Sequence, residues 1–273
     1  MSADLHVHST ASDGTLTPEE IVNQAVRSGL SAISLTDHDT TDGLSRALWA
    51  ASGTNLELVP GIELNTDWQG IEIHVLGYYL EFQSAWFRGI LDDLRNAREK
   101  RAIAIIGKLN KLGISLSSTR VKEIAGAASL GRPHIAQALV EAGYACSVTE
   151  AFQRYLGYGR PAYVTRHKLN PFEAIKLILK ARGVPVLAHP GLMDRDELIP
   201  EFVKAGLLGI EVYYPLHTPE MIEKYARICQ KNDVIMTGGS DYHGPGMDYP
   251  PLGTVTVPYE TVAKLKVLHQ FLN

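Results

Sequence analysis

Short apolar segments of strand length alternate with longer amphipathic segments through most of this chain of 273 residues. The strand-like segments are residues 4–8, 32–36, 56–60, 72–76, 186–188, 209–213 and 234–237. A helix between two strands is the usual connection of parallel strands, which need a crossover of about a dozen residues or more. The pattern predicts an α/β fold, either a closed barrel or an open, doubly wound sheet.

Strand signals disappear between about residues 84 and 158, where helical segments follow one another with glycine-containing breaks. We expect a small helical domain inserted into the α/β fold. The expected boundaries are residues 1–80 and 169–273 for the α/β domain and residues 81–168 for the insertion. Charge is divided similarly, because residues 81–182 hold 17 lysines and arginines against 8 acidic residues, and the remainder holds 9 against 22. The basic part suits anionic ligands and the acidic part suits cations.

Several classes of protein are disfavoured by signals that the sequence lacks. No GxGxxG or GxxxxGK[ST] motif follows the first expected strand, which argues against a dinucleotide-binding or P-loop protein. No apolar run approaches the roughly eighteen residues that span a bilayer, and no charged-then-apolar leader follows Met1. Cys146 and Cys229 lack the spacing of a metal site and fit a reducing compartment. We expect a cytoplasmic protein that does not associate with a membrane and has no stable protein partner.

Histidines and carboxylates gather where the expected strands end. His6 and His8 stand at i and i+2 of the first strand, which points both rings to the same face. The complete set of candidate metal ligands is His6, His8, Asp13, His38, Glu63, His74, His189, Asp241 and His243. The C-terminal ends of parallel strands meet on one face, so these residues can converge in space. The isolated residues His167, His217 and His269 are interpreted as ordinary polar positions.

Imidazole and carboxylate ligands together suit zinc, iron or manganese, whereas magnesium and calcium prefer oxygen ligands. Nine candidate ligands are too many for one ion, so we expect two or three divalent metal ions that share a bridging carboxylate. Such ions would supply a metal-bound hydroxide at neutral pH and stabilise a phosphoryl transition state. The sequence therefore predicts the hydrolysis of a phosphate ester.

Four short segments carry most of these candidates. They are Asp4-Leu5-His6-Val7-His8-Ser9, Thr36-Asp37-His38-Asp39, Ala188-His189-Pro190 and Ser240-Asp241-Tyr242-His243. These segments resemble the four motifs of the PHP (polymerase and histidinol phosphatase) superfamily of metal-dependent phosphoesterases. The resemblance implies an α/β fold of a particular kind, a distorted seven-stranded (β/α)7 TIM-like barrel with a trinuclear metal site.

The resemblance also divides the candidate ligands among three ions. One ion would be held by His6, His8, Glu63 and Asp241, a second by Glu63, His74 and His189, and a third by Asp13, His38 and His243. By the same resemblance, the three ligands of the third ion are the expected catalytic residues. Asp37 would orient one of the metal ligands without binding an ion itself.

The position of the insertion and the strings at residues 131–134 and 159–163 resemble one branch of the superfamily. This branch contains nucleoside 3',5'-bisphosphate phosphatases and 5'-to-3' exoribonucleases. In residues 95–111, the basic side chains of Arg95, Arg98, Arg101 and Lys108 would lie on neighbouring faces of one helix. The expected substrate-binding residues are Arg101, Lys108, Arg132, His134 and Arg160, because forked guanidinium contacts can hold a second phosphate.

Aromatic residues of the insertion are a second feature that suits a nucleotide. They are Tyr144, Phe152, Tyr155, Tyr158 and Tyr163. We expect one of these rings to stack on a base and the others to form the core of the inserted domain.

These features favour a metal-dependent phosphoesterase whose substrate is a phosphorylated nucleotide or a short single-stranded oligonucleotide. The expected reactions are conversion of a nucleoside 3',5'-bisphosphate to the 5'-monophosphate and 5'-to-3' exonuclease cleavage. One alternative is a histidinol-phosphate phosphatase with the same metals, although its cationic substrate would favour carboxylates over arginines in the insertion. The other alternative, a non-catalytic nucleic-acid-binding accessory module, is disfavoured by the complete set of ligands.

Overall fold

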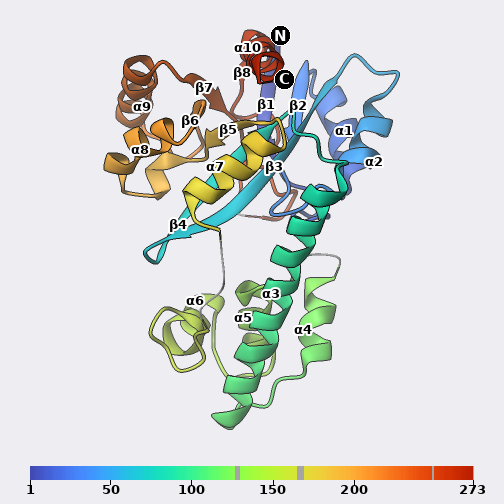
Figure 1. The fold of residues 1–273 in the computed structure, drawn as a ribbon. Helices are drawn as coiled ribbons and strands as arrows, with labels where there is room; N and C mark the ends of the chain where they lie inside the picture. The colour runs from blue at the N-terminus through green and yellow to red at the C-terminus, as the bar shows by residue number, and fades with distance from the viewer. Residues whose placement is uncertain (127–129, 165–168, 248, 273) are drawn as a thin grey trace. The chain divides into compact units, whose positions relative to one another are not determined.

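The computed structural model describes residues 1–126, 130–164, 169–247 and 249–272, with the side chain of Arg98 outside this description. The chain divides into two compact units, Met1–Gly89 with Lys168–Asn273, and Ile90–His167 (Figure 1). The first division falls inside the long helix α3 (Ala85–Lys111). A continuous helix carries no loop signal at that point, which is why sequence composition places the boundary earlier, at residue 80. The expected second boundary, at residue 168, lies outside the described residues.

The described residues of the first unit form one sheet in the strand order β7-β6-β5-β4-β3-β2-β1-β8. The strands are β1 (Ser2–Val7), β2 (Ala32–Leu35), β3 (Glu57–Trp68), β4 (Ile71–Tyr78), β5 (Val184–Leu187), β6 (Gly209–Tyr213), β7 (Ile235–Gly238) and β8 (Val257–Pro258). The sheet curls until the segment after β7 reaches the end of β1, where the backbone N–H of His8 donates to the carbonyl of Tyr242 at 2.9 Å. The expected α/β class and TIM-like barrel are confirmed.

The approach of the segment after β7 to β1 depends on a glycine. A Cβ atom at Gly239 would lie 2.4 Å from the backbone nitrogen of His6. Any side chain there would push the two segments apart. This close approach brings the end of β7 beside the first of the expected ligands.

Two strands run against the direction that the alternation of strands and helices predicts. Strand β4 is antiparallel to both β3 and β5, and the short β8 is antiparallel to β1. The β3–β4 connection has only two central residues, Gln69 and Gly70, with φ angles of 54° and 88°. Positive φ at both positions is typical of a tight hairpin turn, which joins antiparallel strands. The expected parallel arrangement is wrong at β4, and β8 is a strand that the sequence pattern does not predict.

Helices follow the strands of the first unit as the sequence predicts. They are α1 (Pro18–Arg27), α2 (Leu44–Ala51), α7 (Pro171–Lys180), α8 (Ile199–Lys204), α9 (Pro219–Asn232) and α10 (Tyr259–Phe271). Helix α1 begins with a capping box, in which the Thr17 hydroxyl accepts from the backbone N–H of Glu20 and the Glu20 carboxylate accepts from that of Thr17. Such a cap stabilises a helix by about 1 kcal/mol, and here it fixes the end of the loop that contains Asp13.

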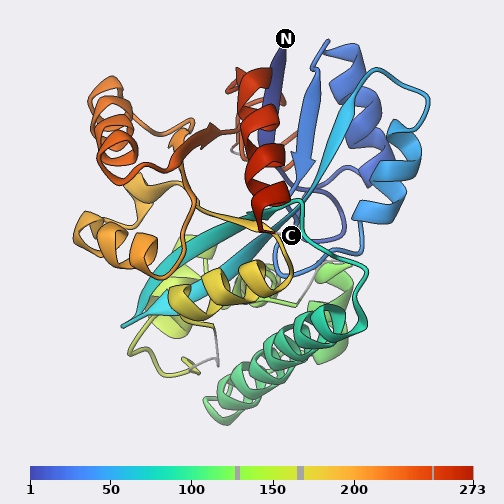
Figure 2. The ribbon, with the colours of Figure 1, turned by 45° about the horizontal axis from the view of Figure 1, so that its top comes forward.

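Apolar clusters hold this unit together, and two of them include residues of the strands. One packs α1 and α2 against β2 and includes Ile21, Leu35 and Leu44. The other joins the strands to α10, the red helix that lies against the sheet in Figure 2. The buried side chains of Val262 and Leu265 on α10 belong to this cluster. The strands are therefore fixed by packing on apolar side chains, which leaves their polar side chains available for the site.

The second unit contains the rest of α3 with α4 (Ser118–Ala125), α5 (Arg132–Glu141), α6 (Val148–Ala151) and a π-helical turn, Phe152–Leu156. These helices have an apolar core of their own, which includes Ile105, Leu109 and Leu139. No strand is present among its described residues, as the sequence predicts. In the part of the chain that the structure describes, no helix is both long and apolar enough to cross a bilayer.

Candidate metal centre

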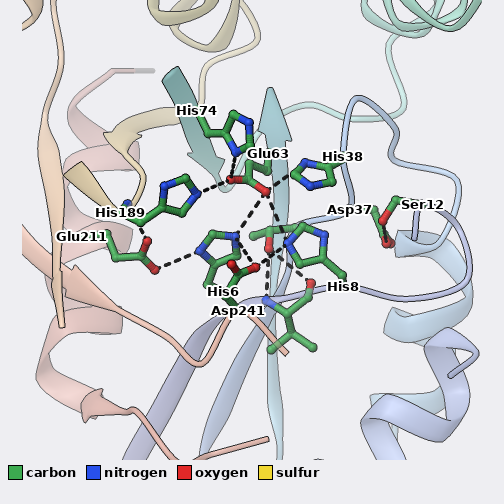
Figure 3. A network of polar contacts seen from close by, with 12 residues as sticks. His6, His8, Ser12, Asp37, His38, Glu63, His74, His189, Glu211 and Asp241 are labelled. Carbon is green, nitrogen blue, oxygen red and sulfur yellow. Dashed lines mark hydrogen bonds and ion pairs between the residues drawn. The ribbon is translucent and has the colours of Figure 1, made fainter. Parts of the chain in front are cut away.

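The carboxylate of Glu63 on β3 lies among five histidine rings (Figure 3). The oxygen Oε2 lies 3.3 Å from His6 Nε2 and His8 Nε2 and 2.9 Å from His38 Nδ1. The oxygen Oε1 lies 2.8 Å from His74 Nδ1 and 3.1 Å from His189 Nε2. Both oxygens of one buried carboxylate therefore face nitrogen atoms that are metal ligands in many proteins.

Three groups of side chains bring possible ligand atoms within 4.8 Å of one another. They are His6, His8, Glu63 and Asp241; His8, Asp13, His38 and His243; and His38, Glu63 and His74. The first group has the composition expected from the sequence. The second contains the three residues expected for one ion and adds His8. The third contains His38 with Glu63 and His74, while the His189 ring reaches this group through Glu63 Oε1.

Most of these rings carry a buried nitrogen without a hydrogen-bond partner. The atoms concerned are His6 Nε2, His8 Nδ1, His8 Nε2, His38 Nδ1 and His74 Nε2, together with Glu63 Oε2. A buried polar atom without a partner costs about 1–3 kcal/mol, so a concentration of such atoms needs an explanation. Divalent ions bound between the rings and carboxylates would satisfy these atoms. The donor set, imidazole nitrogen with carboxylate oxygen, fits this class of ion.

Asp13 is the most exposed of the nine candidates, with 43% of its side chain accessible. Its oxygens lie 3.7 Å from His8 Nδ1, 3.6 Å from His38 Nε2 and 3.4 Å from His243 Nε2. Burial opposes ionisation of this carboxyl, but the neighbouring His38 charge and the hydrogen bond from His243 hold its pKa well below the usual range. Asp13 is therefore an anion at the solvent-facing edge of the cluster.

Asp37 does not contact a histidine ring through any described hydrogen bond. Its carboxylate accepts hydrogen bonds from the Ser9 backbone and hydroxyl and from the Ser12 hydroxyl, at 2.6–2.8 Å. These bonds fix the loop after β1, which presents Asp13. Asp37 therefore orders the loop of one candidate ligand, Asp13, and its expected role in orienting a metal ligand stays a prediction.

A family model described as PHP domain matches residues 4–141, which is half of the chain. The chain belongs to the PHP domain family. The match includes the first two of the four motifs that indicated this family, and Glu63 and His74, which lie between those motifs and the helical unit.

Characterised relatives resemble the PHP domain protein along most of its length. A 5'-3' exoribonuclease from Haemophilus influenzae is 36% identical, covering 89% of this chain and 90% of the relative. A 3',5'-nucleoside bisphosphate phosphatase from Chromobacterium violaceum is 31% identical, covering 89% and 87%. A phosphoribosyl 1,2-cyclic phosphate 1,2-diphosphodiesterase from Eggerthella lenta is 31% identical, covering 93% and 98%.

A solved structure from Bifidobacterium adolescentis, described as a candidate metal-dependent phosphoesterase, has the same fold. Its TM-score is 0.85 at 30% identity, and the alignment covers 97% of this chain and 96% of the other. These similarities confirm the expected enzyme class of the PHP domain protein, a metal-dependent phosphoesterase.

Some residues that order the centre were missed in the sequence. Glu211 on β6 is fully buried and contacts His6 Nδ1 at 2.9 Å. The Tyr214 hydroxyl donates to Asp241 at 3.1 Å, and the Asp4 carboxylate accepts from the backbone and hydroxyl of Ser240. A signal existed for Glu211, because it is a charged residue inside a short apolar strand.

Two of the isolated histidines also have defined structural contacts. The His217 ring is buried and accepts from the backbone of Gly191 while its Nδ1 lies 2.8 Å from the Val212 carbonyl. His269 Nδ1 lies 2.8 Å from the carbonyl of Arg182. The third, His167, lies outside the described residues.

The expected substrate-binding residues all belong to the helical unit. Arg101 and Lys108 on α3 donate to the carbonyls of Val164 and Tyr163, at 2.8 and 2.6 Å. His134 accepts from the backbone N–H of Gly131 at the start of α5. Each of these three side chains therefore has a contact within the helical unit, and its expected role in substrate binding stays a prediction.

Arg132 and Arg160 complete that set. The Arg132 guanidinium lies 5.5 Å from the centre of the Phe152 ring, a cation–π geometry, and Arg160 is exposed. Arg95, from the same expected basic stripe, has an ion pair with Asp92. The side chain of Arg98 lies outside the description.

The aromatic residues of the unit divide between core and surface, with two rings outside the core where the sequence predicts one. Tyr144, Phe152 and Tyr155 pack against the apolar core, whereas 81% of Tyr158 is accessible. The ring of Tyr158 meets the edge of Tyr163 at 5.3 Å between centroids. These two rings are the ones left to stack on a base.

We expect the metal-free protein to lose stability as pH rises from about 6.5 to 10. Burial disfavours the charged rings, but contacts with Asp241 and Glu63 raise the pKa of His8 from 6.5 to about 10, and contacts with Glu63 and Glu72 raise the pKa of His74 to about 9. The folded chain then holds more protons than the unfolded chain in this range, and the free energy of unfolding falls with increasing pH.

Thermal unfolding after treatment with a chelator would measure this dependence. The unfolding temperature should fall between pH 6.5 and 10, and His74→Gln should reduce the slope because it removes one of the raised pKa values. In the metal-loaded protein the slope should be smaller, since metal ions replace protons on the rings. A level or rising profile in the metal-free protein would contradict the expectation.

Proposed function

We propose that this PHP domain binds two or three divalent ions, manganese, iron or zinc, through the nine side chains around Glu63. The proposed ligands are His6, His8, Asp13, His38, Glu63, His74, His189, Asp241 and His243. The observation that carries the proposal is the set of buried ring nitrogens and the Glu63 oxygen without hydrogen-bond partners, in groups whose possible ligand atoms lie within 4.8 Å of one another. The two oxygens of Glu63 face different rings, which suits a carboxylate that bridges two ions.

The bound ions would lower the pKa of water and stabilise the charge of a phosphoryl group. The chain's own residues determine where this chemistry takes place. The rings of His6 and His8 are fully buried, whereas Asp13 is partly exposed. The substrate phosphate therefore enters on the Asp13 side, where the anionic carboxylate and the rings of His38 and His243 orient the attacking water.

We further propose that the substrate is a phosphorylated nucleotide. The names of the relatives from Haemophilus influenzae and Chromobacterium violaceum support an RNA degraded from its 5' end or a nucleoside 3',5'-bisphosphate. The arginines of the helical unit support a substrate with a second phosphate. The exposed ring of Tyr158 supports a substrate with a base, on which the ring can stack. The relative from Eggerthella lenta favours a cyclic phosphate diester as a second candidate.

Phosphate release with and without manganese would test the proposal. The substrates would be adenosine 3',5'-bisphosphate, a short 5'-phosphorylated RNA, a ribose 1,2-cyclic phosphate ester and histidinol phosphate, each with a chelator-treated control. Release from the bisphosphate, with or without stepwise shortening of the RNA, is the expected result. Activity on histidinol phosphate alone would contradict the nucleotide proposal, as would activity confined to the cyclic ester.

We expect Arg132→Ala to raise KM for a nucleoside bisphosphate by about tenfold to a hundredfold, which is the worth of a hydrogen bond to a charged group. KM for an aryl phosphate should stay within a factor of two or so, because this substrate has no second phosphate. Steady-state kinetics on both substrates would measure the difference. Arg154→Ala is the matched control, because Arg154 also lies over an aromatic ring, that of Tyr155, but is already paired with Glu150. An equal rise on both substrates would contradict the role of Arg132.

A further inference from the structure

Glu211 on β6 connects two of the proposed ligands through its two oxygens. Its Oε1 lies 2.9 Å from His6 Nδ1, and its Oε2 accepts the backbone N–H of His189 at 2.8 Å (Figure 3). Glu211 is fully buried, and within the described residues no Lys or Arg side chain pairs with it. A buried carboxylate costs free energy unless its oxygens are hydrogen-bonded. Both oxygens of Glu211 have such contacts, and both contacts are with proposed ligands.

The contact with His6 determines which nitrogen of that ring faces the cluster. When Nδ1–H donates to Glu211, the neutral ring has its lone pair on Nε2. That nitrogen is buried, has no hydrogen-bond partner, and lies 3.3 Å from both Glu63 Oε2 and Asp241 Oδ1. Glu211 therefore selects the form of His6 that can bind a metal ion at the centre of the cluster.

The contact with His189 supports an unfavourable backbone conformation. His189 has φ 25° and ψ 61°, a region that residues other than glycine rarely adopt. Such a conformation persists only when surrounding contacts hold it. The bond from its N–H to Glu211 is such a contact, and it directs the His189 ring so that Nε2 reaches Glu63 Oε1 at 3.1 Å.

We propose that Glu211 is a positioning residue that holds His6 and His189 together in metal-binding geometry. The inference rests on the proposed metal site, because it assigns Glu211 the task of ordering two of its ligands. One carboxylate thereby couples a ring on β1 to a ring after β5, with β6 as the rigid support. Neither oxygen can be replaced by a donor without loss of one of the two contacts.

The variant Glu211→Gln changes the charge and the number of acceptor atoms while the size of the side chain stays nearly the same. Glu211→Gln keeps the shape but replaces one acceptor oxygen with an NH2 group. If the NH2 group faces His6, it favours the ring form with a proton on Nε2, which blocks metal binding. If it faces His189, two N–H donors oppose each other and the strained backbone loses its support.

Metal affinity would test the proposal without reference to any substrate. Manganese dissociation constants, measured by competition with a chelating indicator, and metal content after dialysis would be compared between the wild-type protein and Glu211→Gln. We expect the affinity of the variant to fall by about tenfold to a hundredfold, which is typical of losing the partner of a ligating histidine. In kinetics, raised manganese should restore much of the lost turnover while KM for substrate changes little.

Glu57→Gln is the matched control. Glu57 is also a strand glutamate that accepts through both oxygens, from the Tyr79 hydroxyl at 2.7 Å and the Tyr259 hydroxyl at 2.6 Å, but it contacts none of the proposed ligands. This variant should keep the wild-type manganese affinity even if its unfolding temperature falls. Equal losses of affinity in both variants would assign the effect to general destabilisation and overturn the proposal.

A second variant covers the case in which Glu211→Gln does not fold. Glu211→Asp keeps the charge and both acceptors but is one methylene shorter, so it cannot reach His6 and His189 at once. It should bind manganese more weakly than the wild type, and wild-type affinity in this variant would overturn the proposal. A wild-type protein that binds no divalent ion would instead contradict the proposed metal site itself, which is a separate outcome.

Discussion

Glu63→Gln is expected to reduce kcat/KM by more than about a hundredfold, which is the upper range for losing a residue that only supports a metal ligand. The expectation follows from the position of Glu63, whose two oxygens lie within 3.3 Å of nitrogen atoms from five histidines. Glutamine fits the same space but has no negative charge and only one acceptor oxygen. It cannot bridge two ions, so both neighbouring sites weaken together.

Turnover and metal content of Glu63→Gln would be measured together, at low and at saturating manganese. Lost turnover should accompany a loss of bound metal, and excess manganese should not restore wild-type activity. Glu57→Gln is again the control, because it makes the same exchange on the same strand, β3, away from the cluster. Activity near the wild-type level with a full complement of metal would show that Glu63 does not bridge ions.

Asp13→Ala and His243→Ala are each expected to abolish measurable turnover while the fold persists. Asp13 is the anion on the exposed side of the cluster, and His243 Nε2 lies 3.4 Å from its carboxylate. Removal of either side chain would take a ligand from the ion nearest the entering phosphate. Because Asp13 is partly exposed, the unfolding temperature of its variant should change by less than about 5 °C, given roughly 2–4 °C per kcal/mol for chains of this size.

Phosphate release and thermal unfolding would separate loss of function from loss of structure in these two variants. Asp67→Asn is the control for Asp13→Ala, because Asp67 is also a partly exposed carboxylate whose Oδ1 accepts a backbone N–H, that of Gly70. It should retain full activity. Near-normal rates in either Asp13→Ala or His243→Ala would contradict a role of that residue in the reaction. If Asp13→Ala does not fold, Asp13→Asn would be measured in its place.

Local sequence signals predicted most elements of the barrel. The strand at residues 209–213 has the predicted bounds, and the strand expected at residues 32–36 differs from β2 by one residue. The direction of β4 was the main error. The alternation of strands and helices predicts parallel strands, but a two-residue turn at Gln69 and Gly70 joins β3 to β4, and such a turn permits only antiparallel strands.

The chemistry of the proposed site was predictable because histidine and carboxylate side chains gather at strand ends mainly where they bind a ligand or take part in catalysis. The supporting residues were harder to identify. Glu211 lies within a strand of buried residues, and nothing local states that its two oxygens reach His6 and His189, which are 205 and 22 residues away. Lys108 shows a second limit, because the sequence predicts a substrate-binding cation at this position and does not reveal that its ammonium group donates to the Tyr163 carbonyl.

The sequence by itself determined the α/β class and the types of atom at the centre, because strand alternation and ligand chemistry are local properties, and its resemblance to the PHP motifs indicated the barrel. Only the tertiary structure decided which side chains share an oxygen of Glu63, how Asp37 acts on the loop of Asp13, and that Glu211 joins two ligands. These relations depend on the pairing of strands far apart in sequence. The order and register of those strands are set by packing of the whole barrel, which no short segment encodes.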